Sequence, residues 1–222
     1  KQLIHIADDG TFRLDMRNFT FDHGMRMFNA RFEEVMGRPA RPLGDGPLEQ
    51  FHKDVARSLQ EVVNEVMVAL SRRVLDESGL DRLCLAGGVA LNCVANGHIL
   101  RDAGVRDLFI QPAAGDAGGA MGAALWAWHD LLDKPREWRL DTAYLGPGYD
   151  DAAIAACLEQ YDAPHRVMER SALLDETARL IDEGNVVGWY QGRLEWGPRA
   201  LGHRSILGDP RHPEMRDIIN RK

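Results

Sequence analysis

The sequence predicts an α/β fold, in which strands that end at glycine turns alternate with helices. Residues 81–103 and residues 105–132 each begin with a short apolar run, continue into glycines and end in a helical pattern. The composition agrees with this class, because 45% hydrophobic and 27% charged residues in a chain of 222 are typical of a globular protein with a buried core.

The N-terminal third of the chain predicts a hairpin, a loop and a long helix. Residues 3–7 and 11–16 are strand-like runs on either side of a turn at residues 8–10. Prolines and glycines at residues 37–47 exclude a long regular element there. Apolar residues then recur at helical spacing over residues 48–77, which predicts an amphipathic helix that faces a core.

The middle of the chain predicts the alternating layer. Residues 81–86 are expected to form a buried strand that meets two glycines, followed by a helix over residues 89–103. Residues 105–112 then supply a second strand, and residues 114–132 supply a glycine-rich turn and a helix.

A boundary is expected in residues 133–150, which are charged, contain proline and glycine, and lack periodicity. A second unit follows, with one helix capped by Asp150 or Asp151 and another that begins at Ser171 as N-cap and stops at Gly184.

The charge of the chain narrows the classes of function. A formal net charge of −7 argues against a protein that binds nucleic acid or anionic membranes through a broad basic face. No apolar run approaches the roughly 18 residues of a membrane-spanning helix. The N-terminal residues have no signal-peptide pattern. We therefore expect a protein that partners neither nucleic acid nor membrane.

Several apolar residues are expected to be buried. Cys84, Cys93 and Cys157 are an odd number of cysteines without CxxC spacing, and two of them lie in apolar runs, so we expect reduced, buried thiols in a cytoplasmic protein and no zinc site. Met25, Met27, Trp126 and Trp128 are expected in the core or at its boundary.

Two glycine motifs are candidates for ligand binding. In AGGVALN, residues 86–92, consecutive glycines before a helix allow close approach of a ligand to free N–H groups, although a tight turn without a ligand has the same pattern. In GDAGGA, residues 115–120, Asp116 is suited either to a metal ion or the counter-ion of a phosphate, or to an N-cap position. Because both motifs follow adjacent strands of a predicted parallel sheet, they should face the same edge.

A third motif, EWGPRALGHRS at residues 195–205, places two arginines close together in an acidic chain. The guanidinium groups of Arg199 and Arg204 suit phosphate or carboxylate, and the glycines allow irregular backbone around an anion, whereas a solvated surface loop is the alternative. His203 either joins the arginines or lies on the surface. Four apolar neighbours indicate a partly buried scaffold: Trp196, Leu201, Ile206 and Leu207.

No catalytic residue is assigned from the sequence. The eight histidines are dispersed without HxxxH or HExxH spacing, and no order of Ser, His and Asp indicates a covalent nucleophile.

Four motifs in order, LAGGVALNCVANGHIL, GDAGGAMGAAL, YLGPGYDD and GRLEWGPRALGHRSILGDPR, resemble the O-carbamoyltransferases of antibiotic and nodulation-factor biosynthesis over nearly the whole chain. The resemblance implies the second lobe of an actin-like (ribonuclease-H-like) ATPase domain over residues 1–143. It also implies the start of an α/β domain similar to threonylcarbamoyl-adenylate synthase over residues 144–222. Such an enzyme makes carbamoyl-adenylate from carbamoyl phosphate and ATP and transfers the carbamoyl group to an acceptor hydroxyl.

The resemblance also implies site residues. Gly87, Gly88, Asn92 and Gly115 would lie against the nucleotide, and Asp116 would bind a divalent metal, iron by the resemblance, with Mg accompanying ATP.

The donor site would be formed by Arg199, Arg204 and Ser205, which match the family's GPRALGxRS segment and would hold carbamoyl phosphate or the triphosphate. The family's histidine-containing metal segment and its basic continuation after this motif are not present in this sequence. We therefore expect a fragment of a longer enzyme, without turnover on its own; carbamoyl transfer by the isolated chain would contradict this.

Two other functions remain open. A tRNA threonylcarbamoyl transferase-like enzyme would need electrostatic contact with tRNA, which the charge of the chain and its GPRALGHRS motif disfavour. A nucleotide-binding module without catalysis would bind ATP and ignore carbamoyl phosphate.

Overall fold

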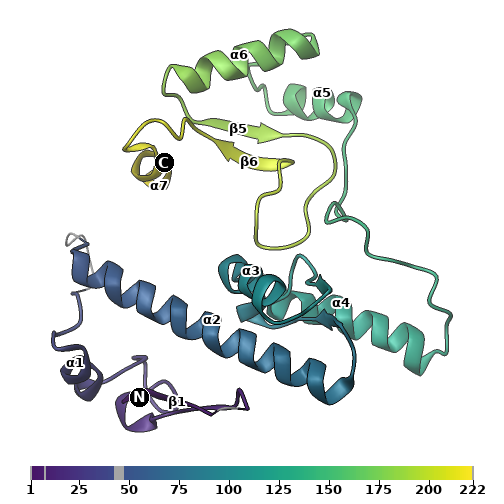
Figure 1. Cartoon of the computed structure of the whole chain (residues 1–222). Coiled ribbons are helices and arrows are strands. Elements are labelled where there is room, and N and C mark those ends of the chain that lie inside the picture. Colours follow the sequence, from purple (N-terminus) through teal and green to yellow (C-terminus); the bar gives the residue numbers. More distant parts are fainter. Residues whose placement is uncertain (1, 8, 43–47, 222) are drawn as a thin grey trace. The chain divides into compact units, whose positions relative to one another are not determined.

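Helices and short strands alternate along the chain, which confirms the predicted α/β class. The computed structural model describes residues 2–7, 9–42 and 48–221 (Figure 1). Its internal contacts divide the chain into a first unit, residues 1–110, and a second unit, residues 111–222. The predicted domain division after residue 143 stays a prediction.

The first unit begins with the predicted hairpin. β1 (Ile4–Ile6) pairs antiparallel with β2 (Phe12–Leu14). Gly10, in the turn between them, has a φ of +81°, and a Cβ there would lie 2.8 Å from the backbone of Ala69. Only glycine fits such an approach. Residue 8 of the predicted turn lies outside the described residues.

A short helix that the sequence pattern did not indicate follows the hairpin. α1 (Ala30–Met36) comes after the single turn η1 (Met16–Asn18), and the Asn29 side chain accepts a hydrogen bond of 3.0 Å from the helix backbone. Seven residues are too few for a clear periodicity. Of the loop predicted at residues 37–47, residues 43–47 lie outside the described residues.

The long amphipathic helix is present as predicted. α2 (Gln50–Ser78) begins at a capping box formed by Glu49 and His52 and ends at Gly79, whose φ is +67°. Its apolar face belongs to the core of the first unit, in which three buried residues are surrounded by partly buried ones: Ile99, Ala103 and Val105 with Met67, Val68, Leu75, Leu83, Leu85 and Leu108.

The predicted alternation of strand, glycine turn, helix and strand is confirmed in the first unit. β3 (Arg82–Cys84) and β4 (Asp107–Phe109) are parallel neighbours, so both end at the same edge. They are joined by a 3₁₀ turn, η2 (Gly88–Leu91), and by α3 (Cys93–Asp102), which packs on α2. The helix predicted from residue 89 thus begins later, after a tighter turn.

The second unit opens with the predicted glycine turn and helix. α4 (Asp116–Trp126) continues into one π-helical turn, η3 (Ala127–Leu131). Trp126 and Trp128 are 57% and 50% exposed, so their predicted burial is wrong. The same prediction is wrong for Met25 and Met27 of the first unit, which are also exposed. Since Gly118 is the buried residue of α4, this helix of small side chains provides no deep layer for the rings.

Two further helices follow an irregular segment. Residues 133–150 contain no helix or strand, as predicted. α5 (Asp151–Gln160) is capped by Asp150, whose Oδ1 accepts a hydrogen bond of 2.8 Å from the helix backbone. The N-cap of α6 (Arg170–Asp182) is Glu169, two residues before Ser171, so the prediction that Ser171 caps this helix is wrong. The backbone changes from extended to helical before this serine.

The chain ends in a hairpin and a helix. β5 (Val187–Tyr190) pairs antiparallel with β6 (Arg204–Leu207), which was not predicted because it continues the non-periodic arginine motif. α7 (Met215–Arg221) follows. Gly184, with a φ of +82°, follows the end of α6 as expected.

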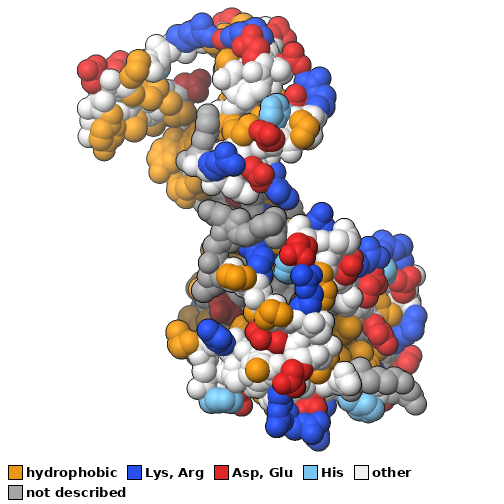
Figure 2. Space-filling view, turned by 90° about the vertical axis from the view of Figure 1, so that its left-hand side faces the viewer, with side chains coloured by type: hydrophobic (Ala, Val, Ile, Leu, Met, Phe, Trp, Pro, Cys, Tyr) orange, Lys and Arg blue, Asp and Glu red, His pale blue; other side chains and the backbone are white. Residues whose placement is uncertain are grey.

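Apolar sequence runs do not guarantee burial in this chain. Cys84, Cys93 and Cys157 are free, but all three are exposed, so their predicted burial is wrong. In the described part of the chain each sheet has two strands, which leaves strand and helix faces without a covering layer. Hydrophobic side chains at the surface are visible in Figure 2. None of the described helices is long and apolar enough to cross a membrane.

Candidate functional site

The arginine motif lies mainly in the long connection between β5 and β6 that Figure 1 shows, here named the arginine loop (residues 191–203). Gly192, Gly197 and Gly202 have φ values of +56°, +112° and +95°. Because other residues rarely adopt such angles, these glycines set the course of the loop.

Glu195 holds the end of the arginine loop from within. Its Oε1 accepts hydrogen bonds from the N–H groups of Leu201 (2.7 Å), His203 (2.7 Å) and Arg204 (3.4 Å). Desolvation disfavours the charged carboxylate, but these N–H groups outweigh it and lower the pKa of Glu195 below its ordinary value of 4.5. The carboxylate is therefore charged at neutral pH and fixes backbone.

Arg204 is engaged by the loop itself. Its Nη1 donates to the carbonyls of Gln191 (2.7 Å) and His203 (2.8 Å), and its Nη2 donates to the carbonyl of Gly192 (3.1 Å). The guanidinium carbon lies 3.4 Å from the centroid of the Tyr190 ring, and Nε is buried without a partner in the described part of the chain. The cation thus stabilises the loop through carbonyls and a cation–π contact.

Arg199 differs from Arg204 in every one of these respects. Its side chain is exposed, as are its neighbours Pro198 and Ala200. Across residues 2–7, 9–42 and 48–221, no hydrogen bond or ion pair engages its guanidinium. An exposed guanidinium on a fixed loop has its full set of donors available for a phosphate or carboxylate.

Ser205 and His203 complete the base of the loop. Ser205 Oγ accepts a hydrogen bond of 3.1 Å from the N–H of Gly202. The His203 ring stacks on Tyr144 with centroids 3.7 Å apart, and its Nδ1 lies 2.8 Å from the carbonyl oxygen of Arg193. His203 is partly buried, and its contacts with Tyr144 and Arg193 place it in the scaffold of the loop.

The apolar residues around the loop are only partly buried. Trp196 and Leu207 are partly buried, as expected of a scaffold. Leu201 and Ile206 are 44% and 64% exposed, so the expected burial is wrong for these two.

The YLGPGYDD motif lies against the arginine loop. The N–H of Gly146 donates to the carbonyl of Leu194 (2.9 Å), whose own N–H donates to the carbonyl of Pro147 (2.9 Å). Arg193 Nε also donates to the carbonyl of Gly146 (2.9 Å). Two motifs that lie far apart in sequence thus form one framework.

The segment that leads into the second glycine motif also contacts the loop. Trp196 Nε1 donates to Gln111 Oε1 (3.2 Å), and a Cβ at Gly197 would lie 2.5 Å from the carbonyl oxygen of Pro112. Gln111 in turn binds both the N–H (3.0 Å) and the carbonyl (2.6 Å) of Ala113. The arginine loop therefore abuts the residues that precede α4.

Asp116 is the first residue of α4, and Gly115 is its N-cap, so the alternative that Asp116 caps the helix is wrong by one position. The carboxylate is exposed in the first turn, where the helix dipole favours negative charge. Within the described residues, no group of three or more His, Cys, Asp or Glu side chains is placed to hold a metal ion. Asp116 alone does not form a metal site.

The first glycine motif exposes backbone after β3. Gly87 has a φ of 102° and a ψ of 164°, a conformation that is essentially restricted to glycine. A Cβ at Gly87 or Gly88 would meet nothing within 4 Å, so the space over this backbone is open. Asn92 serves the fold, because its Oδ1 accepts from Ala95 N (3.1 Å) and its Nδ2 donates to Gln60 (3.0 Å).

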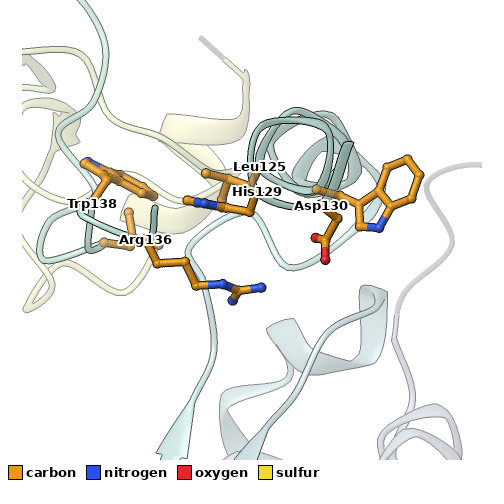
Figure 3. Close-up of a pocket in the computed structure, with 7 residues that line it drawn as sticks. Leu125, His129, Asp130, Arg136 and Trp138 are labelled. Atoms are coloured by element: carbon orange, nitrogen blue, oxygen red, sulfur yellow. The ribbon is translucent and has the colours of Figure 1, made fainter. Parts of the chain in front are cut away.

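A separate pocket of about 350 Å³ lies in the second unit at the end of α4 (Figure 3). His129 and Asp130 come from η3, and Arg136 and Trp138 come from the extended segment that follows. The His129 ring also lies 3.0 Å from the carbonyl of Lys134. None of the predicted site residues lines this pocket, so it is distinct from the arginine loop.

The predicted site residues fall into both units. Gly87, Gly88 and Asn92 belong to the first, while Gly115, Asp116, Arg199, Arg204 and Ser205 belong to the second. Their roles in binding stay predictions. The sequence interpretation missed Glu195 and Gln111, which shape the loop. An acidic residue inside a basic, glycine-rich motif was the available indication of Glu195, whereas Gln111 has no local sequence signal.

Comparison with protein families gives two matches. The carbamoyltransferase N-terminus matches residues 1–125, and the carbamoyltransferase C-terminus matches residues 178–222.

Individual relatives agree with these matches. The chain is 46% identical to an uncharacterized protein of Synechocystis over 99% of the chain and 37% of that protein. It is 44% identical to nodulation protein NolNO of Sinorhizobium fredii over 78% of the chain and 26% of that protein. It is 33% identical to the 3'-hydroxymethylcephem-O-carbamoyltransferase of Streptomyces clavuligerus over 76% of the chain and 30% of that protein. The chain thus spans little more than a third of the length of these relatives, or less.

Proposed function

The chain belongs to the carbamoyltransferase family, and we propose that it is part of an ATP-dependent O-carbamoyltransferase that acts on a small molecule. The observation that carries this proposal is the unengaged guanidinium of Arg199 on a loop that Glu195 and Arg204 fix. Carbamoyl phosphate is an anion whose phosphate oxygens match the forked donors of a guanidinium. A local cation can bind it although the whole chain is acidic.

The three predicted donor-site residues receive different roles in this proposal. Arg199 contacts the phosphate of the donor. Arg204 shapes the same site through the carbonyls that it binds, and Ser205 does so through its contact with Gly202. A direct contact of Arg204 with phosphate would require some of its carbonyl contacts to be exchanged.

Gly87, Gly88 and Asn92 of the first unit and, separately, Gly115 of the second unit are each proposed as contacts of the nucleotide. Support comes from the open backbone at Gly87 and Gly88 and from the free N-terminus of α4 behind Gly115. Asn92 is proposed to act there by shaping the turn through its cap. An actin-like ATPase lobe for this part of the chain belongs to the same proposal.

The proposed reaction has two steps, formation of carbamoyl-adenylate and transfer of its carbamoyl group. Carbamoyl phosphate, water and ATP give carbamoyl-adenylate, phosphate and pyrophosphate. The acceptor oxygen then bonds to the carbamoyl carbon, the bond from that carbon to the adenylate oxygen breaks, AMP leaves, and the hydroxyl proton passes to a base. Phosphate charge must be neutralised in both steps, which is the task proposed for Arg199. The proposal places this reaction in the cytoplasm, where ATP is supplied.

A divalent metal is proposed as a further component, iron or Mg, to which Asp116 would contribute one carboxylate. The acceptor is proposed to be a hydroxyl-bearing small molecule. Relatives with nodulation and cephem names support small-molecule acceptors as a class.

Calorimetry of the full-length gene product tests the proposal. Carbamoyl phosphate should bind in the presence of ATP, and Arg199→Ala should weaken its binding by about 10-fold to 100-fold, the effect expected when a charged hydrogen-bond partner is removed. Arg170→Ala is the matched control, because Arg170 is also exposed and lies in α6, outside the arginine loop. Binding of ATP without any response to carbamoyl phosphate would favour the nucleotide-binding module and overturn the proposal.

A further inference from the structure

We infer that Glu195 is the positioning residue of the donor site: it fixes the arginine loop so that Arg199 meets the carbamoyl donor. The inference rests on the proposed function, since it takes Arg199 as the contact of the donor. It explains why an acidic side chain stands inside a motif that is proposed to bind an anion.

The hydrogen bonds of Glu195 close the loop on itself. Its Oε1 lies 2.7 Å from both Leu201 N and His203 N, which joins the two ends of the stretch that carries Arg199. Other side chains hold carbonyl groups at the same end: Tyr144 Oη donates to Leu201 O (2.9 Å), and Gln191 Nε2 donates to Gly202 O (3.0 Å). Within the described residues, Glu195 is the carboxylate that holds the N–H groups of this end.

The opposite end of the same stretch is also fixed. The N–H of Trp196 donates to Ala143 O (2.6 Å), and its indole donates to Gln111 (3.2 Å). The backbone of Gly197, the next residue, lies so close to Pro112 that a Cβ would have no space. Pro198, Arg199 and Ala200 are therefore an exposed tip between two anchored ends.

The charge of Glu195 does not neutralise Arg199. No ion pair joins the two side chains in the described part of the chain, and the carboxylate accepts hydrogen bonds from backbone N–H groups. A carboxylate that paired with Arg199 would compete with the phosphate of the donor. Directed at the backbone, the same carboxylate orders the loop and leaves the cation available.

Arg199 differs from the other two arginines of this region, Arg193 and Arg204, because both of these bind backbone carbonyls. Arg193 donates to the carbonyls of Gly146 (2.9 Å) and Leu145 (3.0 Å), and Arg204 donates to carbonyls of the loop. Both therefore stabilise the framework. Loss of Glu195 should displace the tip, and a misplacement of about 1 Å in a binding group can reduce a rate about 100-fold.

The test measures pyrophosphate release by the full-length gene product and its variants Glu195→Ala, Glu195→Gln, Arg199→Ala and the double variant Glu195→Ala/Arg199→Ala. Glu195→Ala should raise the KM for carbamoyl phosphate about 10-fold or more and leave the KM for ATP unchanged. Glu195→Gln should have a smaller effect, because its amide oxygen still accepts hydrogen bonds but without the charge that strengthens them. Glu159→Gln, on the exposed surface of α5, should change neither constant.

The double variant separates positioning from an independent effect. If Glu195 acts through Arg199, the double variant should be no worse than Arg199→Ala alone. Additive losses, or an unchanged KM in Glu195→Ala, would overturn the inference. An unchanged KM in Arg199→Ala would instead overturn the proposed role of Arg199 and with it the proposed function. Should Glu195→Ala fail to fold, the same comparison is made with Glu195→Gln.

Discussion

The glycine turn of the first unit and the arginine loop of the second are both irregular, but they are fixed by different means. In the turn, Ala90 N donates to Gly87 O (3.0 Å) and Asn92 N donates to Val89 O (2.9 Å), so its bonds join near neighbours. The arginine loop is held by side chains, including Gln111, which is 85 positions from Trp196. Hydrogen bonds between near neighbours can be predicted from the local sequence pattern, whereas side-chain hydrogen bonds between distant residues cannot.

The two regions also differ in what lies behind them. The turn is followed by α3, whose Ile99 is fully buried in the core of the first unit. The arginine loop rests on polar contacts and on close approaches of glycine to backbone. Substitutions should therefore affect the first region through packing and the second through geometry and charge.

Removal of core packing should have the largest effect. Ile99→Ala should lower the free energy of unfolding by about 3 kcal/mol, because it leaves a cavity in a fully buried site. Urea denaturation measures the change. The neighbouring Leu100 is 48% exposed, so Leu100→Ala should change stability much less, and equal effects of the two substitutions would contradict the assignment of the core.

Filling a close backbone contact in the loop should have the next largest effect. Gly197→Ala should destabilise by about 2 kcal/mol, since alanine is strained at a φ of +112° and its Cβ would meet the carbonyl of Pro112. Gly122→Ala in α4 is the matched control. That site is open and helical, so alanine there should stabilise by about 1 kcal/mol. Thermal unfolding of both variants should therefore shift in opposite directions.

Replacing each arginine of the motif by lysine should have a smaller effect on stability, and the effect should differ between Arg204 and Arg199. Arg204→Lys should lower stability by about 1 kcal/mol, because lysine cannot reproduce the forked contacts with carbonyls and the planar contact with Tyr190. Arg199→Lys should leave stability within about 0.5 kcal/mol, as expected for an exposed side chain. Equal losses of stability in the two variants would remove the distinction between a structural and a binding arginine.

The sequence predicts the regular elements of this chain well where several physical signals coincide. α2 combines helical spacing with a terminal glycine, and α5 combines its spacing with the Asp150 cap. α1 is too short to establish a period, and β6 is hidden in an irregular motif. The thiols were predicted to be buried because their runs are apolar, but burial also requires a covering layer, which a sequence window does not contain.

The candidate site was predictable as a set of residue types and less so as an arrangement. Two guanidinium groups near glycines indicate an anion site, but Arg199 and Arg204 look equivalent in sequence. Their difference arises when β5 and β6 pair, which places Arg204 opposite Tyr190. The role of Glu195 depends on the same pairing, because the N–H groups that it holds lie six to nine residues further along the chain.

The smallest expected effect, the pH dependence of Glu195, tests the charge in the loop directly. Its pKa in the folded protein is lowered below 4.5, the ordinary value, by the N–H groups of the loop, which outweigh desolvation. The stabilisation it provides is therefore fully present above pH 4.5 and is lost as the pH falls through the folded pKa. The difference in unfolding free energy between the wild type and Glu195→Gln should be constant near neutral pH and shrink in acid.

Other carboxylates do not obscure this measurement. Side-chain hydrogen bonds from arginines lower the pKa of three of them, to about 2 in the first two: Asp15, Glu176 and Asp209. Both proteins carry these groups, so their contributions cancel in the difference between wild type and Glu195→Gln. Glu159→Gln controls for the loss of one exposed negative charge. A difference that stayed constant into acid would show that the loop is held by the shape of the Glu195 side chain and not by its charge.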